Sequence, residues 1–287
     1  MNKIQVGFLM SYDYKLLKNS IPFVYEDSDS IFIALDKNFK TWTGDVFEVE
    51  DSFFDWLSNY DIENKITIYK EDFYDSSLNP MENEVRERKM LASKMGIGNW
   101  IIQIDSDEYF INFKDFTQEL KCRNKFLINP ENHKIQIAGY YINLYKHTKD
   151  GILYVSEVRN QKFATNYPNY RTGRNTKERV IYIPNIVIHE CLSRSEEEIR
   201  TKFSNWGHSH QVNIDEFLEK WKLVDQTNYK DYQDFFYLEP EKWKSLDFIK
   251  GKSLDKISKS LAEKKLEPSE FYLAKKNFGQ WFKSIFK

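Results

Sequence analysis

The first hundred residues alternate between short apolar segments and segments whose apolar residues recur at helical spacing. The apolar segments, each typical of a buried strand, are IQVGFLM (4–10), SIFIALD (30–36), KITIY (65–69) and NWIIQID (99–105). The helical segments are 14–25, 53–60 and 79–96, the last with Pro80 in its first turn and Gly96 at its end. This order predicts βαβ units and a largely parallel sheet with helices on both faces.

The pattern changes in the second part of the chain. We expect antiparallel strands at 134–146 and 151–158, a polar loop or acceptor-facing segment at 159–178 and a strongly apolar strand pair or bent strand at 179–190. From residue 193 onward the sequence turns polar, with helical spacing. A chain of 287 residues suits one large α/β domain or two modest ones.

Composition excludes several classes of protein. An aromatic share of 16% argues against disorder, and a net charge of −2 predicts no general attraction to nucleic acid. Cys122 and Cys191 are far apart, so a disulfide framework or a cysteine zinc site is excluded, and a reducing, cytoplasmic setting is the simplest one. The first apolar run is broken by Asp13, unlike a secretory signal, and no run reaches the length of a membrane span.

Polar residues follow several of the predicted strands. Ligands in open parallel sheets bind at the carboxyl ends of the strands, where we expect these residues to converge. The residues at those ends are Ser11, Tyr12 and Asp13, then Asp36, then Asp105-Ser106-Asp107-Glu108, and finally His189-Glu190.

The tripeptide Asp-Ser-Asp at 105–107 is the strongest candidate for a metal site. An Asp-x-Asp pattern is expected by chance in a chain with this many aspartates. The same tripeptide at 27–29 precedes a strand and is typical of a solvated turn. The copy at 105–107 instead ends a buried strand, where carboxylates need a cation or hydrogen-bond donors. Mg²⁺ or Mn²⁺ bound by Asp107 fits this position, and Mn²⁺ also accepts an imidazole such as that of His189. A core histidine capping an apolar strand is the alternative for His189.

Two basic residues are candidates for binding phosphate. Ser195 and Glu198 form a capping box that starts a helix, and Lys202 follows on that helix. Arg88 lies on the helix that precedes the strand at 99–105. For both residues a solvated or salt-bridged surface position remains the alternative.

These residues, in this order, resemble the nucleotide-diphospho-sugar transferases of the GT-A fold, specifically family-2-like glycosyltransferases. The resemblance covers about residues 4–112, and a second match lies at 188–209, where a histidine after a strand precedes an S-x-E-E helix with a lysine. It implies a GT-A-like domain over 1–212, with a nucleotide-sugar-binding half at about 1–112 and an acceptor half at 113–212. A helical C-terminal region would occupy 213–287.

The resemblance also implies a reaction, the metal-dependent transfer of a sugar from a nucleotide-sugar such as a UDP-sugar to a glycan or a lipid-linked acceptor. It further implies roles for individual residues. Ser11 and Tyr12 would contribute to the nucleotide-sugar site, and Asp36 would bind the base or the ribose. Asp105 would contact the ribose or the metal, and Lys202 or Arg88 would neutralise the diphosphate. The metal, Mn²⁺ or Mg²⁺, would be held by Asp107 and His189.

The catalytic base is less well defined. The chain has Tyr12-Asp13-Tyr14 and Glu87-Arg88-Lys89 where the family usually has other residues, and no Glu-Asp base motif follows. Glu157 and Glu190 are the candidates for the base, with Glu157 favoured because it ends a strand in the acceptor half. A structural salt bridge is the alternative for each.

Three further features leave functions open. His208 and His210 could extend the metal site, and the tyrosines between 139 and 182 could stack on sugar rings or belong to the core. The segment 273–287 mixes aromatic residues with lysines, as in a basic amphipathic helix that contacts a membrane surface or docks on the body of the protein. A nucleotidyltransferase and a non-catalytic carbohydrate-binding protein remain as alternative functions.

Overall fold

A computed structural model describes residues 3–205 and 213–285 of this chain and has a mixed α/β fold. The strands are β1 (Ile4–Met10), β2 (Ser30–Asp36), β3 (Ile66–Glu71), β4 (Trp100–Asp105), β5 (Glu108–Phe110), β6 (Ile135–His147), β7 (Gly151–Val155), β8 (Arg159–Thr165), β9 (Arg179–His189) and β10 (Leu246–Lys250). The helices are α1 (Leu17–Val24), α2 (Asp51–Tyr60), α3 (Pro80–Met95), α4 (Phe113–Lys121), α5 (Glu196–Ser204), α6 (Ile214–Leu223), α7 (Leu254–Glu263) and α8 (Glu270–Ile285). Short 3₁₀ turns occur at Tyr14–Leu16, Asn124–Leu127, Tyr229–Asp231 and Pro240–Lys242.

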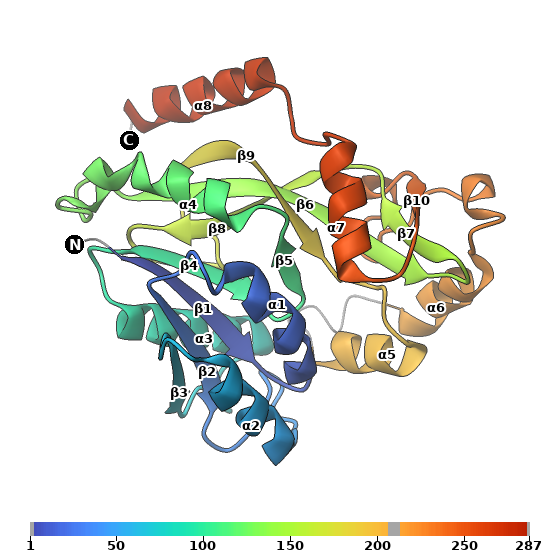
Figure 1. The fold of residues 1–287 in the computed structure, drawn as a ribbon, viewed down its shortest axis with the longest axis horizontal. Helices are drawn as coiled ribbons and strands as arrows, with labels where there is room; N and C mark the ends of the chain where they lie inside the picture. Colours follow the sequence, from blue (N-terminus) through green and yellow to red (C-terminus); the bar gives the residue numbers. More distant parts are fainter. Residues whose placement is uncertain (1–2, 206–212, 286–287) are drawn as a thin grey trace.

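One twisted sheet runs through the molecule in the order β10-β7-β6-β8-β4-β1-β2-β3, with β9 beside β6 and β5 (Figure 1). The strands β3, β2, β1 and β4 are all parallel, as the alternation of strands and helices predicts. The sheet continues through antiparallel pairs of β8 with β4 and with β6. The mixed α/β class is therefore confirmed.

Both faces of the parallel part are covered. Alternate side chains of β1, including Val6 and Phe8, pack with α1, α2 and α4, whereas Leu9 faces α3. Helix α3 lies so close to β1 that a Cβ on Gly7 would be 2.9 Å from atoms of Leu91 and Met95. Glycine at position 7 thus permits the close helix packing that places α3, and with it Arg88, at the strand ends.

The second part of the sheet also carries helices on both sides. The chains of β6, β7, β9 and β10 pack on α7 and α8 through Ile257, Leu261 and Leu273. A separate cluster joins the opposite side to α5 and α6, through Phe203, Leu218 and other residues. This cluster fixes the position of α5, the helix that carries Lys202.

Two sequence expectations are wrong in detail. The segment 159–178 is not all loop, because Arg159–Thr165 forms β8 between β4 and β6 despite its polar composition. Pairing on both sides outweighs the weak strand propensity of these residues. The region after residue 213 is not purely helical, because β10 pairs with β7. Within the described residues, no helix has both the length and the apolar character required to cross a membrane.

Candidate active site

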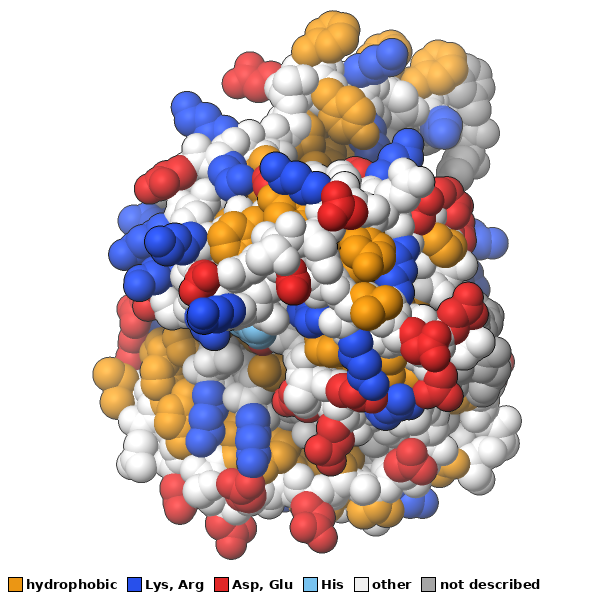
Figure 2. Space-filling model, turned by 90° about the vertical axis from the view of Figure 1, so that its right-hand side faces the viewer, with side chains coloured by type: hydrophobic (Ala, Val, Ile, Leu, Met, Phe, Trp, Pro, Cys, Tyr) orange, Lys and Arg blue, Asp and Glu red, His pale blue; other side chains and the backbone are white. Residues whose placement is uncertain are grey.

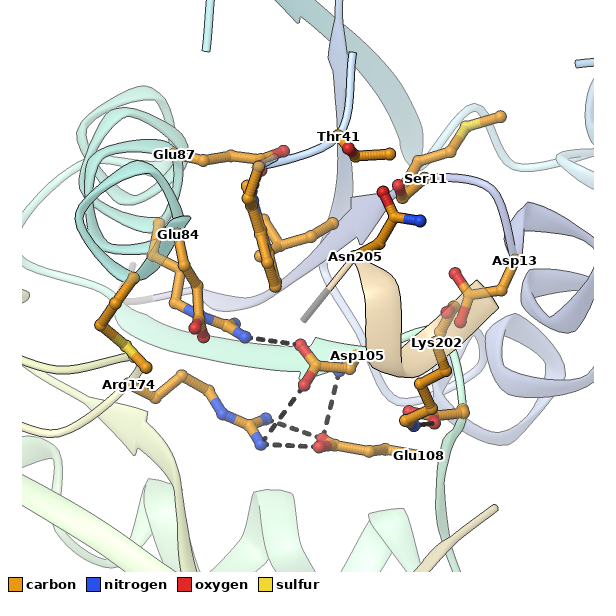
Figure 3. A pocket seen from close by; sticks show the side chains of 18 of the residues that line it. Ser11, Asp13, Thr41, Glu84, Glu87, Asp105, Glu108, Arg174, Lys202 and Asn205 are labelled. Atoms are coloured by element: carbon orange, nitrogen blue, oxygen red, sulfur yellow. Dashed lines mark hydrogen bonds and ion pairs between the residues drawn. The ribbon is translucent and has the colours of Figure 1, made fainter. Parts of the chain in front are cut away.

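A cavity of about 330 Å³ opens at the carboxyl ends of β1 and β4. Most of the residues predicted to form a site line it: Ser11, Tyr12, Arg88, Asp105, Asp107, His189 and Lys202. Side chains from β4, α3 and α5 converge here in Figure 3, in which Lys202 and Asp105 approach from different elements. The structure therefore brings together residues nearly two hundred positions apart in the sequence.

Strand pairing places Asp107 and His189 close to each other. After β4 the chain turns at Ser106 and Asp107 into β5, where Glu108 pairs with His189 of β9. The backbone N–H of Glu190 donates to the carbonyl oxygen of Asp107 at 2.8 Å. The Asp-Ser-Asp segment is therefore fixed to the end of β9 by backbone hydrogen bonds, and the two side chains share one space.

Asp107 lies among cationic groups. Its Oδ2 accepts hydrogen bonds of 2.6 Å from Arg194 and from Lys202, and His189 Nε2 lies 3.5 Å away. Burial alone would raise the pKa of the Asp107 carboxyl, but Lys202, His189 and Arg194 hold that pKa well below its usual range. Arg194 also contacts Asp13 at 3.2 Å, and its side chain is only 4% exposed.

The ring of His189 is held on both sides. Its Nδ1 lies 2.8 Å from Asn143 Oδ1 on the neighbouring strand β6, and the Tyr141 ring stacks on it with centroids 4.9 Å apart. Asn143 Oδ1 can accept a hydrogen bond from Nδ1 of His189, and Nε2 of His189 faces Asp107. Such an outer hydrogen bond is typical of a metal-binding histidine.

Arg88 connects α3 with β4 inside the cavity wall. Its Nε donates to Glu84 at 2.9 Å and its Nη2 donates to Asp105 Oδ1 at 2.7 Å. Its Nη1 is buried and, among the described residues, has no hydrogen-bond partner. Although burial opposes ionisation of Asp105, Arg88 and Arg174 lower the pKa of that carboxyl to about 2. A buried guanidinium with an unused donor in the wall of a cavity is suited to bind a ligand oxygen that reaches it.

Arg174 forms a second buried network that the sequence did not reveal. It donates to both carboxylate oxygens of Glu108, at 2.7 and 2.6 Å (Figure 3). It also donates to the carbonyl oxygen of Gln103 at 2.7 Å. Tyr141 also donates to Glu108. Arg174 stands in a polar segment without periodicity, so no sequence pattern indicated it. Arg194 carried a weak signal, because it directly precedes the predicted capping box at Ser195.

Glu87 contributes an uncharged carboxyl to the same cavity. Its Oε2 accepts a hydrogen bond of 2.6 Å from the indole N–H of Trp42, which also lines the cavity. Burial raises the pKa of Glu87 to about 8, so this side chain is largely protonated at neutral pH.

The donor atoms permit one metal arrangement. Ligand atoms of Asp107, Glu108 and His189 all lie within 4.8 Å of one another. Both oxygens of Glu108 already accept hydrogen bonds from Arg174. The contacts of Asp107 with Arg194, Lys202 and His189 all involve Oδ2, so among the described residues Oδ1 of Asp107 and Nε2 of His189 are the atoms suited to a divalent cation.

Asp36 is not brought to the cavity. Its Oδ1 accepts from the backbone N–H groups of Asn38 and Lys40, and its Oδ2 accepts from those of Phe73 and Tyr74. The side chain is 3% exposed and does not line the cavity. The expected contact of Asp36 with a base or ribose is therefore replaced by a structural role, because its acceptor oxygens serve the loops after β2 and β3.

The expected base residues also lie elsewhere. Glu157 follows β7 and is not part of the cavity lining, and its Oε2 is buried without a partner among the described residues. Glu190 lies beside a different hollow and accepts a hydrogen bond of 2.5 Å from Tyr109. Most tyrosines between 139 and 182 are core residues, except that Tyr141 reaches the site. His208 and His210 lie outside the described residues.

No protein-family profile matches the chain, and no curated protein matches it at a significant level.

Proposed function

We propose that this chain is a metal-dependent glycosyltransferase of the GT-A type, which uses a nucleotide-sugar, a UDP-sugar, as the donor. The acceptor would be a hydroxyl group of a glycan or a lipid-linked saccharide. In this reaction the acceptor oxygen bonds to the anomeric carbon and the bond from that carbon to the diphosphate breaks. The leaving diphosphate takes the electron pair, and the hydroxyl proton passes to a base.

The observation that supports this proposal is the unused donor of Arg88 in a cavity that also holds Asp105, Asp107 and Lys202. Cationic groups in the wall of a cavity favour an anion whose charge increases during the reaction. The position at the carboxyl ends of parallel strands is where α/β sheets bind nucleotides.

In this proposal Asp107 and His189 would hold Mn²⁺ or Mg²⁺. The metal would supply charge stabilisation for the leaving diphosphate. Lys202 would bind the same anion, and Arg194 would keep Asp107 ionised from its buried position beside the cavity. Asn143 and Tyr141 would orient the imidazole of His189.

A binding experiment tests the first half of the proposal. We expect UDP with Mn²⁺ to raise the melting temperature of the full chain by a few degrees, and UDP or Mn²⁺ alone to do so less. Asp107→Asn and His189→Ala should abolish the joint effect. Asp115→Asn, at an exposed position on α4, is the matched control.

A product assay tests the second half. Release of UDP from a UDP-sugar, abolished by Asp107→Asn and retained by Asp115→Asn, is the expected result. Release of pyrophosphate from a nucleoside triphosphate would favour a nucleotidyltransferase instead. Binding of saccharide without any turnover of nucleotide-sugars would indicate a non-catalytic protein.

A further inference from the structure

Helix α8 packs on the sheet with polar side chains. Asn277 donates to the carbonyl oxygen of Tyr182 at 2.9 Å and accepts from the N–H of Tyr182 at 2.8 Å. These bonds occupy the free edge of β9, and Leu273 is the buried apolar contact of the helix. The Nζ of Lys276 lies 4.1 Å from the centroid of the Tyr182 ring. The inner side of α8 is therefore largely hydrophilic.

The outer face of α8, formed by Phe271, Phe278, Trp281 and Ile285, is apolar and exposed. These side chains are 80%, 63%, 44% and 55% exposed. Figure 1 places α8 at the top of the molecule, and Figure 2 shows hydrophobic side chains gathered there with lysines among them. An amphipathic helix normally turns its apolar side to the core, so the reverse orientation of α8 indicates a second surface that covers it.

The charged side chains of α8 indicate which kind of surface covers its outer face. Lys275 and Lys283 are exposed on α8, whereas Glu270 at its first residue is the only acidic side chain of the helix. Exposed aromatic rings flanked by lysines match the interface of an anionic bilayer, where rings enter the headgroup region and ammonium groups meet lipid phosphates. We propose that the outer face of α8 docks this protein on an anionic lipid surface, independently of the activity proposed above.

A second copy of the chain fits this face less well. Two α8 helices packed through their outer faces would bring lysines of like charge together, with only Glu270 to offset them. A lipid surface with negative headgroups removes this repulsion.

Vesicle sedimentation of the full chain tests the proposal. We expect binding to vesicles of equal parts phosphatidylcholine and phosphatidylserine, little binding to pure phosphatidylcholine, and weaker binding at high salt. The double variant Phe278→Ser/Trp281→Ser should reduce the partition coefficient by at least about tenfold. Lys275→Glu/Lys283→Glu should also reduce it, selectively on the anionic vesicles.

Matched controls separate docking from general stickiness. Ile62→Ser and Ile128→Ser remove side chains that are 80% and 66% exposed on other surfaces, and should leave binding unchanged. Brominated lipid should quench tryptophan fluorescence in the natural chain and markedly less in Trp281→Phe. Circular dichroism and melting curves check that every variant is folded.

Two results would overturn the proposal. The first is absence of binding to anionic vesicles, or binding that Phe278→Ser/Trp281→Ser leaves intact. The second is a stable dimer in analytical ultracentrifugation that the same double variant dissociates, since the face would then belong to a contact between two copies. If Phe278→Ser/Trp281→Ser loses lipid binding but keeps full UDP-sugar turnover, the docking proposal is supported and the enzymatic one is unaffected, whereas lipid binding by the natural chain without turnover would refute only the enzymatic one.

Discussion

Lys202 Nζ and Asp107 Oδ2 lie 2.6 Å apart, and this ion pair joins helix α5 to the turn between β4 and β5. Burial works against the charge of Lys202, yet Asp107 outweighs it and the pKa of Lys202 is raised. Both groups are therefore ionised at neutral pH. Lys202 is held at the cavity by Asp107, which is also the proposed metal ligand. Binding of a metal by Asp107, or of a diphosphate by Lys202, would therefore weaken the ion pair between them.

Lys202→Met should separate these two functions of the lysine. Asp107 keeps Arg194 as a partner, so the free energy of unfolding should fall by only about 1–2 kcal/mol. The melting shift caused by UDP with Mn²⁺ should largely disappear. Arg200→Met, on the exposed side of the same helix, should change neither quantity appreciably. An unchanged UDP response in Lys202→Met would exclude Lys202 from diphosphate binding.

Arg88→Lys should keep the positive charge but lose the several N–H donors of the planar guanidinium group. A lysine cannot reach Glu84, Asp105 and a ligand oxygen at once, so we expect stability to fall by roughly 2 kcal/mol and nucleotide affinity by more than about tenfold. Chemical denaturation and isothermal titration with UDP measure the two effects. Lys89→Gln, exposed on the same helix, serves as control. Equal UDP affinity in Arg88→Lys and the natural chain would contradict the role given to Nη1.

The raised pKa of Glu87 should make the stability of the folded chain depend on pH. Burial raises its pKa from an ordinary value of 4.5 to about 8 in the folded chain. Below pH 4.5 both states are protonated, and between these values only the unfolded state releases its proton. The folded state should therefore lose stability as the pH rises from about 4.5 to 8, by roughly 3–5 kcal/mol.

Glu87→Gln isolates that effect. Glutamine can still accept from Trp42 and does not titrate, so the variant should gain stability relative to the natural chain as the pH increases through this range. Urea unfolding at several pH values measures the difference. Glu267→Gln, an exposed control, should follow the natural chain. Parallel curves for Glu87→Gln and the natural chain would show that Glu87 ionises normally.

Asp36→Asn tests the structural role of that carboxylate. An amide can accept with one oxygen only, so the backbone N–H groups of one of the two loops would lose their acceptor and face an amide NH₂ group, and stability should fall by roughly 2–3 kcal/mol. UDP affinity, measured by calorimetry at low temperature where the variant is folded, should change by less than about threefold. Lost UDP binding with unchanged stability would restore Asp36 as a nucleotide ligand.

The sequence predicted the parallel part of the fold well because its signals are local. The strands β1 and β2 have the expected limits, and α3 begins at Pro80 and ends before Gly96 as its capping residues indicate. β8 was missed because its polar residues become a strand only through pairing with β4 and β6, which are distant in sequence.

Only those site residues that lie at the end of a predicted strand could be predicted from the sequence. Asp107 follows the apolar strand β4 and His189 is the last residue of the apolar strand β9, so their meeting followed from the sheet topology. Asp36 has the same local signature, but backbone N–H groups of its own and a neighbouring loop use its oxygens. Arg174 lies in an irregular segment, and only the folded chain shows that it neutralises Glu108.

Strand β9 pairs with β6 along most of its length and with β5 at its end, so Glu108 and His189 are neighbours although β6, β7 and β8 lie between them in the chain. A nick between residues 112 and 113 would therefore yield complementing fragments and not two independent proteins. We expect neither fragment to assemble the cavity alone, and their mixture to regain it only as fast as β5 finds β9.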